Sequence, residues 1–215
     1  MKIRIYFSLL LLIIIASCKK NETDSVILYQ DNFSIDEKTW PVDSTDYRVK
    51  YYYQGHYIMR VDSINYLAYS LAPYSLNFSY AEQVDATIQL ENSDKLGNIG
   101  FVFNHIDNSN YSVIEICNNG TYRIWTKNNG IDSTIVSSTF NSAINTGNGI
   151  KNTIKIIQGS SSLELQINNN SIGSFSIPLP KSTYFTVGIS TGTGVPITYF
   201  TTVKGLFNNF ILSKI

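Results

Sequence analysis

The sequence is poor in the residues that mark several common protein classes. Its 215 residues include only two cysteines, two histidines and five prolines, and 16 basic side chains are balanced by 16 acidic ones. Two cysteines cannot hold together a disulfide-rich scaffold. The balanced charge argues against a nucleic-acid-binding protein, which usually carries a basic excess. With 43% hydrophobic and 13% aromatic residues, the chain is also too apolar for intrinsic disorder.

The motifs of the common metal and nucleotide enzymes are missing as well. The two histidines, His56 and His105, form no HExxH or His-x-His pattern and have no cysteine pair beside them, so no zinc site is expected. No nucleophile elbow, P-loop or dinucleotide fingerprint occurs. A catalytic Cys117 would need a histidine close by, and we expect instead a buried thiol that behaves as a small hydrophobic side chain.

The longest apolar run lies at the N-terminus. Lys2 and Arg4 precede a run from Tyr6 to Ala16. This run is shorter than the about 20 residues that a membrane-spanning helix needs, but it has the length of a signal-peptide core.

The run ends in Ile-Ala-Ser-Cys at residues 15–18, which resembles the bacterial lipobox. The resemblance implies a signal peptide at 1–17, a lipidated Cys18 with a tether at 18–30, and a lipid bilayer as partner. Lys19 rather than aspartate follows the cysteine, which indicates the outer membrane of a Gram-negative bacterium, with the domain facing the periplasm or the outside. The alternative is a secretory signal with a chance cysteine.

From Asp31 onward, short runs of period-two alternation recur and no convincing amphipathic helix is found. Such runs cover 84–90, 101–103, 111–117, 122–126, 153–158, 163–167, 183–190 and 205–213. Turns rich in Asn and Gly separate them, because these residues tolerate the positive φ of tight hairpins. About twelve short strands predict an all-β antiparallel sandwich or barrel in one domain, 31–215.

Five segments occur in an order that resembles bacterial laminin-G-like or concanavalin-A-like jelly-roll domains. They are DNFSIDEKTWPV, YLAYSLAP, VDATIQL, GFVFNHIDNSNYSVIEICNNGTYRIW and GLFNNFIL. The resemblance implies a sandwich of two curved antiparallel sheets, often with a sugar groove on the concave face. It specifies the fold more closely than the function, because this fold hosts many activities. Trp40 matches the opening tryptophan and is expected in the core.

The resemblance also implies a structural Ca²⁺ site between the opening and closing motifs. Asp31 matches the first ligand, whereas Asn208 stands where the family has aspartate. A neutral amide oxygen is a weaker ligand for a hard cation than a carboxylate. Asp31 and Asn208 are therefore a weak candidate site, and no other cofactor is expected.

A retaining glycoside hydrolase of this fold carries closely spaced carboxylates on one strand. No E-x-D-x-E or E-x-D-x-x-E string occurs here. Asp85 and Glu91 share a strand face but would lie about 20 Å apart, and Glu115 stands alone in its run. We therefore expect no catalytic residues.

Two hairpins predict which side chains share a face. With Asn108-Ser109 at the tip of the first, Phe103 is expected opposite Ile114 and Val102 opposite Glu115. Because a one-residue slip would mix the two faces, the clean sorting that results supports this register.

The second hairpin has residues 118–120 as a three-residue loop. This loop places Glu115 opposite Arg123 and Val113 opposite Trp125. The face away from the core then collects Asn104, Tyr111, Val113, Glu115, Arg123, Trp125 and Lys127.

That face has the chemistry that a saccharide needs. Trp125 and Tyr111 offer rings that stack on sugars, while amide, carboxylate and guanidinium groups bond hydroxyls. One alternative is a solvated sheet face with a cross-strand ion pair between Glu115 and Arg123. A second alternative has Trp125 covered by a loop and serving as core.

A further concentration of aromatic residues surrounds the Gln54-Gly55 turn, namely Tyr47, Tyr51, Tyr52, Tyr53 and Tyr57. Tyrosine is favoured both in strands and at recognition surfaces. We interpret this cluster as edge strands with half-buried rings.

The leading hypothesis is a non-catalytic envelope lipoprotein that binds a polysaccharide on its concave sheet face. The alternative is a structural or protein-interaction sandwich without sugar specificity. A third reading is a glycoside hydrolase-like enzyme with an unrecognised site.

Overall fold

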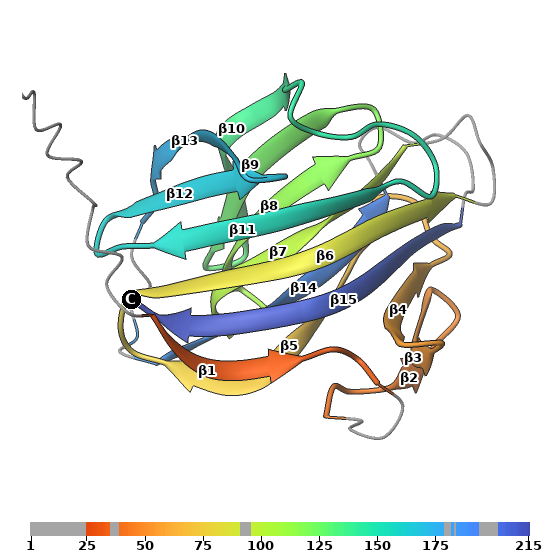
Figure 1. Cartoon of the computed structure of the whole chain (residues 1–215), viewed down its shortest axis with the longest axis horizontal. Helices are drawn as coiled ribbons and strands as arrows, with labels where there is room; N and C mark the ends of the chain where they lie inside the picture. Colours follow the sequence, from red (N-terminus) through yellow and green to blue (C-terminus); the bar gives the residue numbers. More distant parts are fainter. Residues whose placement is uncertain (1–24, 35–38, 91–95, 179–181, 183, 194–201) are drawn as a thin grey trace, which may run out of the picture.

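The computed structural model describes residues 25–34, 39–90, 96–178, 182, 184–193 and 202–215. The predicted signal peptide and Cys18 lie outside these residues. Within the described ranges there are fifteen strands and no helix (Figure 1), which confirms the all-β prediction. The same residues contain no helix of the length and hydropathy that a membrane span requires.

The strands form two antiparallel sheets (Figure 1). In the nine-stranded sheet the order is β13-β12-β11-β6-β15-β4-β3-β2, and β1 also pairs with β15. Its strands are β1 (Val26–Asp31), β2 (Asp43–Ser44), β3 (Arg48–Tyr53), β4 (His56–Val61), β6 (Tyr80–Leu90), β11 (Lys151–Gln158), β12 (Ser162–Ile167), β13 (Asn170–Ser176) and β15 (Val203–Lys214). The first strand begins inside the range assigned to the tether.

The six-stranded sheet has the order β10-β9-β8-β7-β14-β5. Its strands are β5 (Leu67–Leu76), β7 (Gly97–Asp107), β8 (Asn110–Cys117), β9 (Thr121–Asn128), β10 (Ile131–Phe140) and β14 (Phe185–Thr193). Because strands that are distant in sequence are neighbours in both sheets, the arrangement is the jelly-roll sandwich that the resemblance implied.

Alternation along each strand builds the core between the sheets. On β6, Val84, Ala86 and Ile88 are buried, whereas Asp85 and Gln89 reach solvent. The same period-two burial occurs on β9, β11 and β12. The core contains nine buried aromatic side chains. Trp40 is one of them, as predicted.

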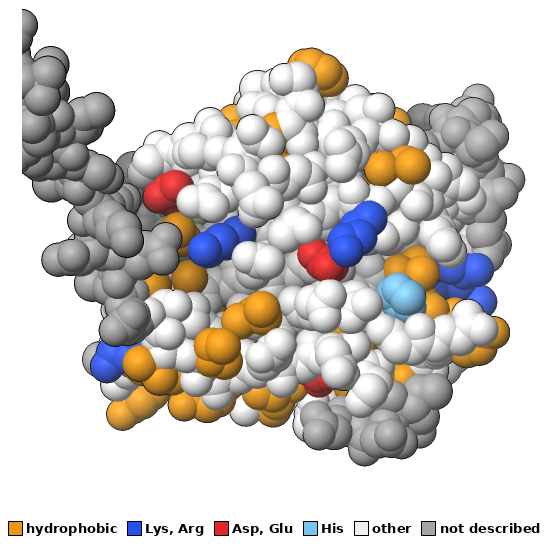
Figure 2. Space-filling view, in the orientation of Figure 1, with side chains coloured by type: hydrophobic (Ala, Val, Ile, Leu, Met, Phe, Trp, Pro, Cys, Tyr) orange, Lys and Arg blue, Asp and Glu red, His pale blue; other side chains and the backbone are white. Residues whose placement is uncertain are grey.

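The outer face of the nine-stranded sheet is mixed in character (Figure 2). Charged side chains are scattered over it, and hydrophobic side chains gather along the lower edge of the view, where β1 lies. Val26 and Ile27 of this strand are both more than half exposed. The groove described below is on the other sheet.

The tyrosine cluster lies on the β3–β4 hairpin, whose turn residues Gln54 and Gly55 have φ of 48° and 73°. The half-buried interpretation holds for Tyr51 and Tyr52. It is wrong for Tyr57, which is fully buried, and for Tyr47 and Tyr53, which are both more than half exposed. The Tyr57 hydroxyl donates to the carbonyl oxygen of Pro41 at 2.5 Å and contacts the hydroxyl of Ser70 at 2.8 Å. This ring therefore belongs to the core.

The first predicted hairpin register is wrong by two residues. The turn is as expected, since Asp107 faces Asn110, but Ile114 lies opposite Phe101 and Glu115 opposite Gly100. The ladder is irregular between Phe103 and Asp107, where Asn104 adopts a φ of 51°. Because the shift is even, the side chains that pair in the regular part of the ladder stay on their predicted faces.

Candidate functional site

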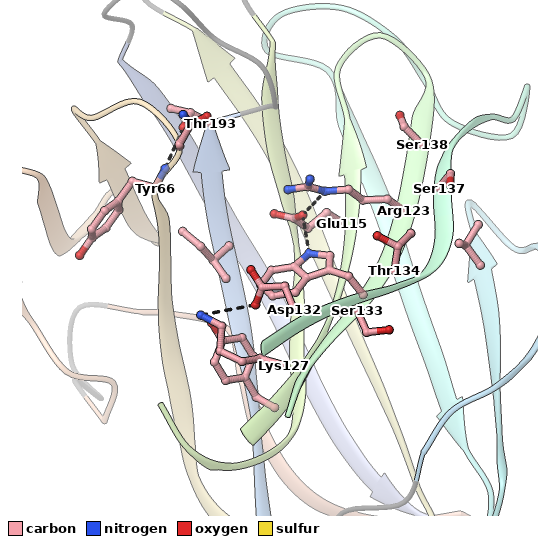
Figure 3. Close-up of a pocket in the computed structure, with 15 residues that line it drawn as sticks. Tyr66, Glu115, Arg123, Lys127, Asp132, Ser133, Thr134, Ser137, Ser138 and Thr193 are labelled. Atoms are coloured by element: carbon pink, nitrogen blue, oxygen red, sulfur yellow. Dashed lines mark hydrogen bonds and ion pairs between the residues drawn. The ribbon is translucent and has the colours of Figure 1, made fainter. Parts of the chain in front are cut away.

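A groove of about 680 Å³ opens on the outer face of the six-stranded sheet (Figure 3). β8 and β9 supply its floor, and β10 forms one wall. The β4–β5 loop and the end of β14 supply the opposite wall. Five predicted residues line it, namely Tyr111, Glu115, Arg123, Trp125 and Lys127. The second hairpin has the predicted register, with Glu115 opposite Arg123 and Val113 opposite Trp125.

Glu115 is the anchor of the groove floor. The residue is only 2% exposed, and its Oε2 accepts hydrogen bonds from Arg123 Nε at 2.6 Å and from Trp125 Nε1 at 3.1 Å. Its Oε1 has no hydrogen-bond partner among the described residues. One buried carboxylate thus fixes both the guanidinium and the indole, and charge-assisted hydrogen bonds of this kind are the strong ones.

Two glycines on the neighbouring strands lie close to Glu115. Gly100 lies directly opposite Glu115, and a Cβ placed on Gly192 would stand 3.5 Å from Glu115 Oε1. The same Cβ would lie 3.0 Å from the carbonyl oxygen of Tyr66. A side chain at Gly192 would therefore press on the backbone of the groove wall and come into contact with the carboxylate.

Trp125 is half-buried and keeps part of its surface in the groove. The alternative in which a loop covers this ring completely is therefore wrong. Its ring meets Tyr111 edge-on, with centroids 5.7 Å apart. The alternative of a solvated ion pair is also wrong for Glu115, because that carboxylate is buried beneath the groove rather than hydrated on a flat sheet.

Lys127 joins the floor to the β10 wall. Its ammonium lies 3.6 Å from Asp132 Oδ1 and 5.4 Å from the centroid of the Tyr111 ring. Partial burial lowers the pKa of Lys127, but Tyr111 and Asp132 outweigh that effect, and the net pKa is raised. The groove therefore holds two cations that each face a carboxylate.

Asn104 does not line the groove, which corrects the prediction for this residue. It is 4% exposed, and neither atom of its amide has a hydrogen-bond partner among the described residues. The physical reason is the irregularity of β7 between Phe103 and Asp107, which withdraws Asn104 from the regular alternation.

Several residues of the groove were missed from the sequence, most of them on β10: Asp132, Ser133, Thr134, Val136, Ser137 and Ser138. The Asn-Asn-Gly turn at 128–130 could have signalled a second hairpin strand. β10 shows no apolar alternation, because most of its residues are exposed. Asn65, Tyr66 and Thr193 reach the groove from distant segments. No local sequence pattern predicts that they line it.

The candidate calcium residues are held by other contacts. Oδ1 of Asp31 accepts from the Phe33 amide at 2.6 Å, and Oδ2 accepts from the hydroxyls of Tyr29 and Thr39 at 2.8 and 2.9 Å. The side-chain oxygen of Asn208 accepts from the next amide at 2.8 Å. The groups around Asp31 donate hydrogen bonds to its carboxylate, and in this arrangement they do not serve as ligands of a cation. No cluster of three or more metal-binding side chains occurs in the described ranges, and the calcium site stays a prediction.

Cys117 is a free, buried thiol within the described residues, as expected. Burial raises its pKa, which keeps the thiol protonated and a poor nucleophile. It lies beside a smaller cavity of about 60 Å³ next to the groove, and Glu115 and Arg123 line both spaces.

No family model matches the sequence, and no curated protein matches it significantly. Solved structures with the same fold include the Bacillus licheniformis β-glucanase, with a TM-score of 0.62 and 11% identity over 88% of this chain and 99% of that one. The carbohydrate-binding module CBM66 from Bacillus subtilis gives 0.58 and 12% over 82% and 96%.

An endo-β-galactosidase from Clostridium perfringens that releases GlcNAcα1-4Gal gives a TM-score of 0.59 at 10% identity, over 88% of this chain and 63% of that one. These similarities show the fold, and the protein is a two-sheet antiparallel jelly-roll sandwich of the concanavalin-A-like kind. Its structural neighbours include both carbohydrate-binding modules and glycoside hydrolases.

Proposed function

We propose that this protein binds a glycan in the groove on the six-stranded sheet and does not cleave it. The observation that carries the proposal is the fixed pair of Trp125 and Arg123 on the buried carboxylate of Glu115. Ligand sites combine apolar and aromatic walls with a few well-placed polar groups. A ring and a guanidinium that are already held in place lose little conformational entropy when a ligand binds.

The walls add the hydroxyl groups that a sugar can bond. Ser133, Thr134, Ser137 and Ser138 of β10 border the groove on one side, and Thr193 borders it on the other. Because the structural neighbours include a carbohydrate-binding module and glycan-acting enzymes, the same fold is compatible with this use. Their low identity means that the proposal depends on the groove itself.

The non-catalytic part of the proposal rests on the state of the carboxylates. Of the described residues, Glu115 and Asp132 are the two acidic ones that line the groove. Glu115 is engaged by Arg123, and Asp132 is ion-paired with Lys127. Glycoside hydrolysis needs one carboxyl as an acid and a second as nucleophile or base. In this groove each of the two carboxylates is ion-paired with a cation.

Affinity electrophoresis tests the binding. The wild type would migrate through gels that contain β-glucan, xylan, levan, pectin or mucin, beside Trp125→Ala. We expect at least one polysaccharide to retard the wild type, and Trp125→Ala to bind it roughly thirtyfold more weakly, as expected for a central aromatic anchor worth about 2 kcal/mol. Tyr184→Ala is the matched control, because this tyrosine is 64% exposed and outside the groove.

Retardation of the wild type by none of these polysaccharides, or equal retardation of Trp125→Ala, would overturn the binding proposal. The catalytic question has its own assay. The same polysaccharides would be incubated with the wild type and analysed for new reducing ends. We expect none, and release that disappears in Glu115→Gln would show that the protein is an enzyme.

We also propose that Cys18 carries lipid and anchors the domain to the outer membrane, facing either the periplasm or the outside. This proposal rests on the lipobox-like residues 15–18 and on Lys19. Stable anchoring needs more than one acyl chain, as in bacterial lipoproteins. Fractionation of cells that express Cys18→Ser tests it: the variant should leave the membrane fraction, and its retention there would show that lipid is not the anchor.

A further inference from the structure

A second groove of about 500 Å³ adjoins the first on the outer face of the six-stranded sheet. The two grooves share three lining residues, Tyr66, Leu67 and Tyr111. The first extends from this shared boundary to β10, and the second extends over β5 towards β3. Together they cross the strands of the sheet rather than following one of them.

An apolar floor continues from one groove into the other. Val102, Tyr111 and Val113 are buried at its centre, and half-buried side chains from β5 and β9 pack against them. Among these half-buried side chains, Trp125 and Tyr69 lie at opposite ends of the floor. Their rings are linked through Tyr111, with centroids 5.7 Å apart on either side.

The polar groups of the second groove are also held in place. Asp43 accepts from Lys50 Nζ at 2.9 Å and from Arg48 Nη2 at 3.1 Å, and Lys50 is only 7% exposed. Arg48 Nη1 in turn donates to the hydroxyl of Tyr66 at 2.7 Å, which fixes a residue of the shared boundary.

The Tyr69 hydroxyl donates to Asn108 Oδ1 at 2.5 Å. This bond joins β5 to the turn between β7 and β8. The second groove thus shares two features with the first: an aromatic ring on the floor, and two cations of which each is ion-paired with a carboxylate.

We infer that the two grooves form one binding track for several consecutive units of a linear polysaccharide. This inference rests on the proposed function and adds the class of glycan, because a terminal sugar would need only one groove. The units around Trp125 anchor the chain, and the units beyond Tyr111 reach Tyr69, Asn108 and the cations. Contacts of the second groove form at a high effective concentration once the first is filled, so affinity rises with chain length.

Calorimetric titration with trisaccharides and hexasaccharides of β-glucan, xylan, levan and pectin tests the inference. The wild type should bind the hexasaccharide of its preferred polysaccharide roughly tenfold more tightly than the trisaccharide, a difference of about 1.4 kcal/mol. Asn108→Trp places a large ring on an exposed turn at the second groove. It should remove this gain and leave the trisaccharide affinity unchanged.

Ser160→Trp is the matched control, because it puts the same ring on an exposed turn of the other sheet and should alter neither affinity. Equal wild-type affinity for both lengths would overturn the inference while leaving the proposed function intact. Hexasaccharide binding that Asn108→Trp leaves unchanged would also overturn it. Failure of the wild type to bind any oligosaccharide would overturn the inference and the proposed function together.

Discussion

Two glutamates, one between the sheets and one beneath the groove, are almost equally buried but differently supported. Glu82 on β6 is 1% exposed, and neither of its carboxylate oxygens has a hydrogen-bond partner among the described residues. Glu115 on β8 is 2% exposed and accepts hydrogen bonds from Arg123 and Trp125. Burial of the two side chains is therefore alike, and the difference lies in what faces each carboxylate.

The consequence of this difference is electrostatic. Burial raises the pKa of Glu82 well above its ordinary value, since no cation or donor among the described residues compensates for lost hydration. The neighbouring Tyr80 hydroxyl also has no partner among the described residues, and burial raises its pKa as well. The interior thus holds a carboxyl without partners at a cost to stability, while the carboxylate beneath the groove holds two ligand-binding groups in place.

Removing the cation from the groove should give the largest effect on stability. Arg123→Met leaves the buried carboxylate of Glu115 without its ion-pair partner, which should lower the free energy of unfolding by about 3 kcal/mol at pH 7. Urea denaturation measures the change. In the double variant Glu115→Leu/Arg123→Met, most of that stability should return, because the uncompensated charge is gone.

A loss below about 1 kcal/mol for Arg123→Met would place this pair with ordinary surface ion pairs. In that case the contrast between the two glutamates would not hold.

Removing the carboxyl from the interior should have the opposite sign and a smaller size. Glu82→Leu replaces a buried group without partners by an apolar one and should raise the free energy of unfolding by about 2 kcal/mol at pH 7. Glu82→Gln should gain less, because its amide would also lack partners. Destabilisation by Glu82→Leu would show that the carboxyl makes a contact that stabilises the native state.

The pH dependence of this gain follows from the raised pKa of Glu82. Below about pH 4, the carboxyl is protonated in both the folded and the unfolded state, so no proton is exchanged on unfolding. As the pH rises through the unfolded pKa towards the folded one, the unfolded state releases a proton and the wild type loses stability. The difference between Glu82→Leu and the wild type should therefore grow with pH, as urea denaturation at several pH values would show.

The smallest effect concerns the thiol beside the groove. Burial raises the pKa of Cys117, so the native protein should react with a thiol reagent far more slowly at pH 8 than the urea-unfolded protein does. Comparable rates in the two states would mean that this end of β8 opens readily.

The sequence predicted the floor of the groove better than its walls. Glu115, Arg123 and Trp125 were placed together because a short turn and strict alternation determine which side chains share a face. The irregularity at Asn104 has no comparable signal, because one asparagine with positive φ shifts the register without changing the apolar pattern.

The residues of the walls and of the second groove could not be predicted from alternation and turn length. β10 is exposed along most of its length, so no alternation reveals it. Tyr66, Arg48 and Thr193 reach the grooves through pairings between strands that are far apart in the chain. Jelly-roll crossovers create these neighbours, and a single sequence does not encode them locally.

The two tryptophans of the chain offer the most direct test of the central claim, that the groove around Glu115 is the glycan-binding site. The indole N–H of Trp125 donates to Glu115, whereas that of Trp40 donates to Tyr29 at 3.0 Å inside the core. Their two NMR signals would be followed during titration with whichever hexasaccharide binds in calorimetry. The Trp125 signal should shift with the calorimetric affinity while the Trp40 signal stays in place. Saturable binding that leaves the Trp125 signal unmoved would contradict the claim.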